Sequence, residues 1–342
     1  MGLLVWLGLR RANEWEPPTL LDWLVFDSPL QWLASGAYHI ILVLRGRPFR
    51  PPRRDDALRP PIRVVCLSDT HDHILKRSAI PDGDLLIHCG DLTNDGRRAS
   101  IQRQIDWLAG LPHAHKVFVC GNHDSWFDPN ARREEDIDGG GGEAGGKGGG
   151  ELDLKGLVYL ENSAVTLEFK GGRKLNVYGS PAVPQCGDAS NAFQYVRWLH
   201  PWNGTIPAET DVLITHTPPR HHLDLDLGCA GLLEEVWRVK PKLHVFGHIH
   251  WGHGRESIYF DECQRAYESV MARPKRGLIY DVVSSAAWMD AFRILWHGLN
   301  SIVWKWVMLG PGSNNGGLMV NAAVVYGNTG KLRRNPVTVV EL

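Results

Sequence analysis

The middle of the chain contains five short apolar runs that each stop abruptly at polar residues. These runs predict strands at residues 62–67, 84–89, 117–120, 211–214 and 243–246. Unbroken apolar runs of this length are typical of strands buried on both faces of a parallel sheet. Asp, Asn or His follows shortly after each run. Since ligands of open α/β sheets bind beyond the carboxyl ends of the strands, we predict that the five polar ends converge on one site.

Other periodic patterns predict the elements that complete this sheet. Apolar residues recur every three or four positions between 97 and 111, which predicts the crossover helix that parallel strands require. The apolar runs 320–325 and 337–340 predict two closing strands.

Residues 1–60 form a predicted N-terminal extension, hydrophobic and then proline-rich, ahead of a domain that covers residues 61–342. The segment 19–44 is rich in Leu and Trp, but its apolar runs are well short of the roughly 20 residues that a membrane-spanning helix needs. We therefore expect helices packed on the domain. The alternative is a segment that lies in a membrane interface, where Trp with flanking Arg is common.

Two predicted insertions interrupt the domain. Residues from about 131 to 152 include a run of almost pure glycine that cannot form a packed core, so we expect a flexible surface loop. Residues from about 254 to 317 are rich in Trp, and within them 286–309 repeats apolar residues at helical spacing. We expect a helix that caps the fold. The alternative is a helix that faces a membrane or a partner, packed with 19–44.

The composition is that of an ordinary globular protein, with 342 residues, 43% hydrophobic and 22% charged. A formal net charge of −1 gives no electrostatic basis for binding nucleic acid, which we do not expect. Three of the six cysteines, Cys66, Cys89 and Cys120, lie inside predicted strands, and no CxxC pair is present. We expect free thiols in a reducing compartment, hence a cytoplasmic protein, with peripheral membrane contact through 19–44 and 286–309 as the further option.

The polar residues beyond the strands are those of a divalent-metal site. They are Asp69, His71, Asp91, Asn122, His123, His216, His248 and His250. Carboxylate and amide oxygens mixed with imidazole nitrogens suit Mn, Fe or Zn, and the identity of the metal stays open. The set is too large for one tetrahedral ion and fits two ions that share one carboxylate. Such a pair clamps the attacking and leaving oxygens of a displacement at phosphorus and lowers the pKa of a bound water.

In chain order, these residues resemble the motif series of the calcineurin-like metallophosphoesterases. The blocks are Asp69-Thr70-His71, Gly90-Asp91, Gly121-Asn122-His123-Asp124, His216 and Gly247-His248-Ile249-His250. The resemblance covers about 62 to 253 and the closing strands. Finer details, such as Thr215-His216-Thr217-Pro218-Pro219, are similar to the branch called metallophosphoesterase domain-containing proteins. The implied fold is an α/β fold in which two β-sheets form a sandwich flanked by helices, in four layers (αββα).

The resemblance also implies a role for each motif residue. Asp69, His71 and His250 would hold one metal ion, Asn122, His216 and His248 would hold the other, and Asp91 would bridge them. His123 would face the substrate and protonate the leaving oxygen. Asp124 would orient the imidazole of His123, as carboxylates do for other catalytic histidines.

We therefore expect a dinuclear metal-dependent phosphoesterase, in particular a phosphodiesterase that acts on a small phosphate ester by attack of metal-bound hydroxide. The alternative is a metal-binding scaffold with little turnover, or a membrane-associated interaction protein on the same fold. The complete ligand set speaks against that alternative. A nuclease is disfavoured because the chain has no basic stripe with interleaved aromatic residues. We expect His88 and His244 to be structural, and Arg220, His221 and His222 to be loop residues.

Overall fold

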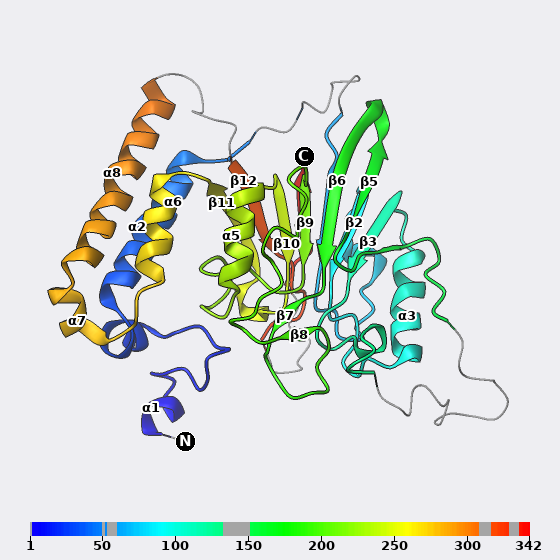
Figure 1. The fold of residues 1–342 in the computed structure, drawn as a ribbon, viewed down its shortest axis with the longest axis horizontal. Coiled ribbons are helices and arrows are strands. Elements are labelled where there is room, and N and C mark those ends of the chain that lie inside the picture. Colours follow the sequence, from blue (N-terminus) through cyan, green and yellow to red (C-terminus); the bar gives the residue numbers. More distant parts are fainter. Residues whose placement is uncertain (1, 50–51, 53–59, 133–150, 308–315, 328–334) are drawn as a thin grey trace. The chain divides into compact units, whose positions relative to one another are not determined.

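The computed structural model describes residues 2–49, 52, 60–132, 151–307, 316–327 and 335–342. The glycine run of the predicted 131–152 loop lies outside these residues. The chain divides into two compact units, each built from two stretches of sequence (Figure 1). Unit 1 comprises Met1–Arg50 and Glu256–Leu318, and unit 2 comprises Pro51–Arg255 and Met319–Leu342.

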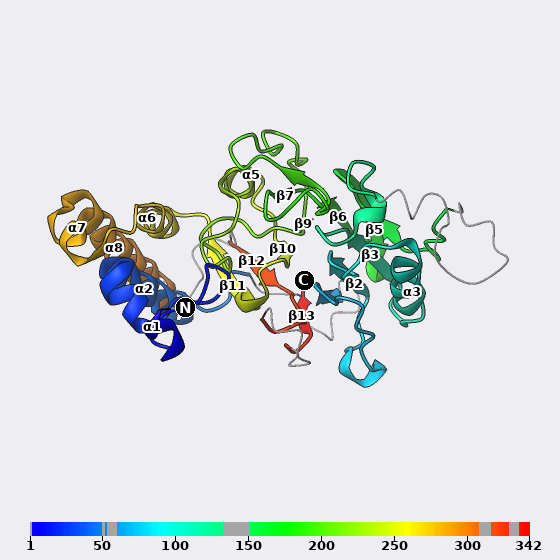
Figure 2. The same ribbon diagram turned by 90° about the horizontal axis from the view of Figure 1, so that it is seen from below.

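A five-stranded sheet has the order β13-β1-β2-β3-β4 (Figures 1 and 2). Its strands are β1 (Arg63–Leu67), β2 (Leu85–Cys89), β3 (His115–Val119), β4 (Val158–Tyr159) and β13 (Thr338–Glu341). The first four run parallel, and β13 pairs antiparallel with β1 at the edge. The helix α3 (Arg98–Ala109) joins β2 to β3, as the periodicity of 97–111 predicts.

A six-stranded sheet has the order β11-β12-β10-β9-β6-β5. Its strands are β5 (Ser163–Phe169), β6 (Arg173–Ser180), β9 (Val212–Thr215), β10 (Leu243–Phe246), β11 (Gly254–Tyr259) and β12 (Gly316–Asn321). The strands β6, β9 and β10 are parallel. The helix α5 (Ala230–Val239) connects β9 to β10, and β7 (Val183–Pro184) pairs with β8 (Gln194–Tyr195) in a separate small sheet. Two sheets with helices confirm the predicted fold class.

The central strands are buried on both faces. Val65, Leu86 and Phe118 project from β1, β2 and β3 into one cluster with Ile101 and other residues of α3. The alternate residues of these strands face the opposite way, and they are buried as well. There the second sheet approaches closely, since a Cβ on Gly179 of β6 would lie 2.8 Å from Cγ1 of Val119. This double burial explains why the strands read as unbroken apolar runs.

The predicted strand 320–325 is only partly correct. The strand β12 ends at Asn321, whose Nδ2 donates hydrogen bonds to the carbonyls of Leu223 and Ile249. The chain then leaves the six-stranded sheet, and Ala323 forms an isolated parallel bridge with Ser68, just beyond β1. The apolar run therefore serves two strands in turn, a switch that its alternation does not reveal.

Unit 1 is helical. It contains α1 (Leu3–Trp6), a π-helical turn (Asp22–Phe26), α2 (Pro29–Arg45), α6 (Glu262–Met271), α7 (Gly277–Val283) and α8 (Ser285–Val307). The helix α2 begins where the Ser28 hydroxyl accepts the backbone N–H of Gln31 and Pro29 occupies the first turn, a favourable start for a helix. Figures 1 and 2 show α2, α6 and α8 side by side.

Segments far apart in the sequence hold unit 1 together. The ring of Tyr38 in α2 stacks on Tyr267 in α6, with centroids 4.0 Å apart. The buried carboxylate of Asp281 accepts hydrogen bonds from the Ser28 hydroxyl and from the backbone N–H of Leu30. Gly298 of α8 lies against Ile41 of α2, so the predicted 286–309 helix packs with the 19–44 segment. Among the described residues, no helix combines the length and the apolar character that crossing a membrane requires.

The six cysteines are all free, and Cys66, Cys89 and Cys120 are buried in or beside the strands, as predicted. His244 is structural in the same core. The hydroxyl of Thr215 donates to the carbonyl of Thr217, so it must accept the Nε2–H of His244 at 2.8 Å. The Nδ1 atom of His244 is buried without a partner in the described structure. Burial, assisted by the nearby His222, lowers the pKa of His244 to about 3.

We predict that His244 makes the metal-free protein sensitive to acid. Its folded pKa lies below the unfolded value of about 6.5, so the unfolded state binds the proton more readily, and stability falls as the pH drops from about 6.5 towards 3. At pH 5 this group alone lowers the free energy of unfolding by about 2 kcal/mol relative to pH 7. Urea unfolding at the two pH values should show a smaller difference for His244→Gln. Equal differences for variant and wild type would contradict this account.

Candidate metal centre

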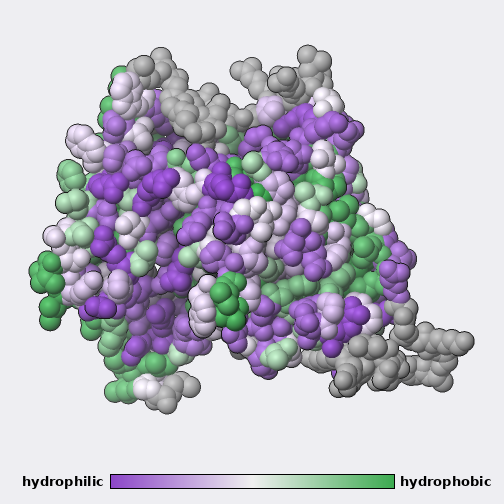
Figure 3. Space-filling model, in the orientation of Figure 1, coloured by the Kyte–Doolittle hydropathy of each residue, from purple (hydrophilic) through white to green (hydrophobic). Residues whose placement is uncertain are grey.

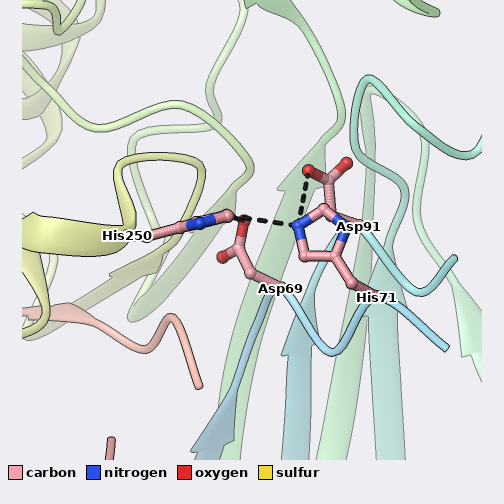
Figure 4. Close-up of side chains that lie close together, drawn as sticks. All are labelled: Asp69, His71, Asp91 and His250. Atoms are coloured by element: carbon pink, nitrogen blue, oxygen red, sulfur yellow. Dashed lines mark hydrogen bonds and ion pairs between the residues drawn. The ribbon is translucent and has the colours of Figure 1, made fainter. Parts of the chain in front are cut away.

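Both sheets present their polar residues at the same place. Asp69 follows β1 by two residues and Asp91 follows β2 in the same way, while His216 comes directly after β9. His250 begins a 3₁₀ turn after β10. Figure 4 shows Asp69, His71, Asp91 and His250 pointing toward one another from these loops. The predicted convergence of the strand ends is therefore present in the structure.

The first group consists of Asp69, His71, Asp91 and His250, whose candidate ligand atoms lie within 4.8 Å of one another. The Nε2 atoms of His71 and His250 are 3.2 Å apart. Nε2 of His250 lies 3.3 Å from Oδ1 of Asp69. All four residues are buried or nearly so, in a cluster with two oxygen and two nitrogen donors.

The second group consists of Asp91, His216 and His248, again with ligand atoms within 4.8 Å. The Oδ1 atom of Asn122 joins it, at 3.0 Å from Nε2 of His216. The structure thus brings together all seven residues that the sequence proposed as ligands, and in the proposed partition.

Asp91 belongs to both groups. Its Oδ2 lies 3.6 Å from Nε2 of His71, and its Oδ1 lies 3.5 Å from Nε2 of His216. The backbone N–H of His123 donates to Oδ1 at 2.9 Å and fixes the carboxylate. One carboxylate with its two oxygens directed at two ligand groups is the arrangement that a bridging ligand needs.

Hydrogen bonds outside the groups orient the ligand atoms. Nδ1 of His216 donates to the carbonyl of Cys89 at 2.8 Å, and Nδ1 of His250 donates to the carbonyl of Gly327 at 3.2 Å. Each bond leaves the Nε2 lone pair for a ligand position. The Nδ2 of Asn122 donates to Oδ1 of Asn191 at 2.9 Å, so the amide oxygen of Asn122 faces the second group.

The backbone is unusual at the ligands themselves. Asp69, His71, Asp91 and His248 have left-handed φ values of 54°, 44°, 52° and 67°. Such conformations are uncommon for residues other than glycine, and they cluster at functional sites where the surrounding fold enforces them. They turn the chain sharply at each strand end and direct the side chains inward.

Two glycines leave room for the carboxylates. A Cβ on Gly121 would collide with Oδ1 and the backbone nitrogen of Asp91, and a Cβ on Gly247 would collide with Oδ2 of Asp69 and the hydroxyl of Ser68. Any larger residue at either position would displace a ligand.

The electrostatics suit cations. Burial opposes ionisation of Asp69, but its hydrogen bond and charge interaction with His250 outweigh burial and hold the pKa of Asp69 well below its ordinary value. The same partner overcomes burial to raise the pKa of His250 to about 9. Burial and the neighbouring His216 lower the pKa of His248 to about 3. Ionised carboxylates beside imidazoles are the donors that divalent ions take, and an ion held by His250 would displace the proton of that imidazole, so the residues present fit a pair of such ions.

His123 lies beside the first group without belonging to it. Its ring centroid is 5.1 Å from that of His71, at an angle of 80°. Its Nδ1 donates to the carbonyl of Asn94 at 3.1 Å, and its Nε2 has no hydrogen-bond partner among the described residues. Burial disfavours its charged form, but the charge of Asp91 and the Asn94 carbonyl outweigh this and raise the pKa of His123.

Asp124 does not contact the imidazole of His123 as expected. Its carboxylate accepts the backbone N–H groups of Gly121, Leu92 and Thr93 and the hydroxyl of Thr93. It therefore ties the loop after β3 to the loop after β2. Burial, reinforced by the charge of Asp91, raises the pKa of Asp124 to about 6. The carbonyl of Asn94 takes the orienting position that the sequence suggested for Asp124.

No sequence motif identifies several of the supporting groups. Asn94 looks like a turn residue, yet its carbonyl holds His123 and its Nδ2 donates to the carbonyl of His71. Asn191, Cys89 and Gly327 also act through an amide oxygen or a main-chain carbonyl. Main-chain acceptors carry no residue identity, so a motif search cannot find them.

Two other histidines of unit 2, and Arg220, have structural partners. Nε2 of His88 lies 3.0 Å from the hydroxyl of Thr70, between the ligands Asp69 and His71. Arg220 pairs with Asp226 within its own loop at 3.1 Å. Nε2 of His253 donates to the carbonyl of Pro336 at 3.0 Å.

Comparison with known proteins agrees with this site. Residues 62–252 match the family model described as calcineurin-like phosphoesterase. The human metallophosphoesterase domain-containing protein 1 is 35% identical over 257 residues, which cover 64% of this chain and 72% of that protein. A UPF0046 protein of Caenorhabditis elegans is 38% identical over 227 residues, covering 62% of this chain and 78% of the relative.

A third relative is longer. The protein named "Probable rhamnogalacturonate lyase C" of Emericella nidulans is 37% identical over 281 residues. The match covers 81% of this chain but 24% of that protein, so the chain spans about a quarter of this relative's length. Most of that protein lies outside the matched region, so its name is not carried over to this chain.

We predict that the metal-stripped protein binds two Mn²⁺ ions per chain and that His250→Ala binds one. The substitution removes a ligand of the first group and leaves the second intact. Elemental analysis after gel filtration would count the ions. His253→Ala is the matched control, because His253 lies three residues away and bonds a carbonyl outside both groups. Loss of an ion in the control, or two ions in His250→Ala, would contradict the assignment.

We also predict that Asn191→Ala weakens the binding of only one Mn²⁺ ion, the one at the second group. Without the Asn191 acceptor, the Asn122 amide loses its fixed orientation, and such supporting contacts typically change metal affinity by about 10–100-fold. Stepwise calorimetric titration would resolve the two affinities. Ser190→Ala, at the exposed neighbouring position, should leave both unchanged. Equal weakening of both ions would mean that Asn191 supports the loop in general.

Proposed function

Because the chain belongs to the calcineurin-like phosphoesterase family, we propose that it is a phosphodiesterase that acts through the paired Asp–His groups. Family membership and the candidate metal ligands support the broader statement, a metal-dependent phosphoesterase. We further propose that the substrate is a phosphate diester and that His123 protonates its leaving oxygen.

The single observation that carries the proposal is the position of the Asp91 carboxylate between the two groups. Its two oxygens face the histidines of two different groups, so the site is built for two cations held side by side. When bound, two divalent ions would polarise a phosphoryl oxygen and lower the pKa of water, the chemistry that displacement at phosphorus needs. Asp69, His71 and His250 would hold one ion, Asn122, His216 and His248 the other, and Asp91 both.

The chain's own proton donor is His123. The Asn94 carbonyl fixes the proton on Nδ1, which leaves Nε2 to hold a second proton and deliver it to the leaving oxygen of the ester. Its ring stands next to His71 and is only partly buried, so a bound substrate could reach it. General acids of this kind typically contribute a factor of about 10²–10⁴.

The charge around the centre favours a diester. The carboxylates of Asp69 and Asp91 interact mainly with imidazoles, and neither is paired with a lysine or an arginine of the described chain. Where proteins bind phosphate through arginine, the guanidinium frequently forms two parallel hydrogen bonds with it. A diester carries one charge and needs no such guanidinium, because the cations and His123 suffice.

One observation supports a second candidate function, that of a metal-binding scaffold that acts through interactions. Unit 1 contributes nothing to the ligand set and exposes many apolar side chains. The complete ligand set and the proton donor favour the enzyme.

We predict that bis(p-nitrophenyl) phosphate is hydrolysed by the metal-stripped protein only after Mn²⁺ is restored. His123→Ala should lower kcat by about 10²–10⁴-fold because the leaving oxygen loses its proton donor, while both ions stay bound. Asp91→Asn should lose activity together with metal, and His253→Ala should retain both. Faster turnover of p-nitrophenyl phosphate than of the diester would refute the diester proposal. No turnover of either ester by protein that holds two ions would favour the scaffold.

A further inference from the structure

Exposed apolar side chains are distributed very unevenly between the two units. In the described structure only four large hydrophobic residues of unit 2 are exposed, namely Ile74, Val196, Trp198 and Leu199. All the other exposed large hydrophobic residues belong to unit 1. Unit 2 therefore exposes few large apolar side chains, as ordinary domains do. Unit 1 exposes many, which is typical of a surface that binds a protein or a membrane. Figure 3 shows hydrophobic residues at the left edge of the view, over α7 and α8, and at the lower left, over α1, as well as others over unit 2.

The helix α8 carries the longest exposed stripe. Its members recur at three- and four-residue spacing, which places them on one side of the helix: Trp288, Met289, Phe292, Leu295, Trp296, Leu299, Val303 and Trp304. The stripe is about 24 Å long at 1.5 Å per residue. The opposite side of α8 is buried, with Ile294 in the core of unit 1 and Gly298 against Ile41 of α2. Packing within unit 1 thus leaves the stripe uncovered.

Two other helices have the same character. In α2 the exposed positions include Trp32, Leu33, Ile40, Val43 and Leu44, and the whole stretch from 28 to 44 contains no charged residue. In α7 the exposed residues are Leu278, Ile279, Val282 and Val283, of which Ile279 is 81% exposed.

The acidic residues of these helices are withdrawn from the surface. Asp281, the acid of α7, is buried and accepts hydrogen bonds from the start of α2. Asp290, the acid of α8, is buried, and it pairs with Arg273 at 2.6 Å and accepts the hydroxyl of Ser269. The exposed sides of α2, α7 and α8 therefore present no negative charge.

Cationic residues, by contrast, flank the apolar surface. Lys275 and Arg276 directly precede α7, with their charges 5.2 Å from the ring centroids of Trp23 and Tyr280, respectively. Near the N-terminus, Arg10 lies over the ring of Phe26 at 4.3 Å. Arginine or lysine on an aromatic ring at the margin of an apolar surface is typical of segments in the interface of a bilayer, where the rings enter the headgroup layer and the cations meet lipid phosphates.

We propose that unit 1 binds the surface of a membrane that contains anionic lipids, with the exposed sides of α2, α7 and α8 inserted into the headgroup layer. Because no described helix can span a bilayer, the association is peripheral. The charge pattern selects lipid over a second copy of the chain or a partner helix. Protein interfaces surround an apolar centre with a mixed polar rim, whereas here the acids of α7 and α8 are buried and the two charged residues directly before α7 are cationic. The proposal is independent of the phosphodiesterase activity.

The experiment is co-sedimentation of the full chain with vesicles of phosphatidylcholine, with and without phosphatidylserine. We expect binding that requires phosphatidylserine and weakens with salt. The double substitution Ile279→Glu and Trp296→Glu should reduce partitioning at least tenfold, because it places two charges among the inserted side chains. Trp198→Glu is the matched control, since Trp198 is 81% exposed in unit 2 and offers the same chemical change elsewhere. Lys275→Gln, which removes one positive charge worth about 1 kcal/mol at an anionic surface, should lower the affinity for the anionic vesicles about fivefold.

The outcomes separate cleanly. All the substituted residues are exposed or partly exposed, so the variants should melt at the temperature of the wild type, which a thermal scan verifies. The proposal is wrong if the wild-type protein binds neither kind of vesicle. It is also wrong if the double variant partitions onto vesicles as strongly as the wild type. If sedimentation without vesicles shows a dimer that the double variant abolishes, and vesicles bind neither form, the surface belongs to a second copy and the lipid proposal is wrong.

Discussion

The arrangement of the candidate metal centre in unit 2 depends on two buried carboxylates. Asp69 and Asp91 lie in one cluster, out of water, where an unpaired negative charge is very unfavourable. Imidazoles of three histidines lie between 3.3 and 3.6 Å from their oxygens, and His250, whose pKa is raised to about 9, pairs its positive charge with Asp69. A fold that keeps both acids ionised and close together must either supply positive charge or hold space for it. The position of the histidines follows from this requirement.

The sheets make that arrangement rigid. Strands buried on both faces cannot shift without opening the core, so their carboxyl ends are fixed points. The strain is concentrated one or two residues further on, in the left-handed conformations of Asp69, Asp91 and His248. Such residues would relax if the ends were mobile. The packed strands therefore sustain the backbone geometry, and the geometry aims the ligands.

The sequence predicts what depends on residue identity and periodicity. Apolar runs locate the strands, and the Asp, Asn and His residues after them locate the ligands, because only those side chains can serve. It fails where the structure uses atoms that every residue has. The carbonyls of Asn94, Cys89 and Gly327 orient three histidines, and no pattern marks them. Prediction from the sequence also fails where one apolar run pairs with two different strands. The 320–325 run begins in the six-stranded sheet as β12 and then pairs beside β1 of the other sheet.

Buried acids elsewhere in the chain show what distinguishes a ligand from a structural residue. Asp124 is surrounded by hydrogen-bond donors, three from the main chain and one from Thr93. Asp281 has a hydroxyl and a backbone N–H. These acids are satisfied by the protein, and each fastens two segments together. Asp91 is different, since its Oδ2 faces the imidazole of His71 at 3.6 Å, beyond hydrogen-bond distance. Both acids lie in polar loops that follow buried strands, and in the structure the number of hydrogen-bond donors around each carboxylate distinguishes Asp124, which fastens two loops together, from Asp91, whose oxygens face the histidines of two groups.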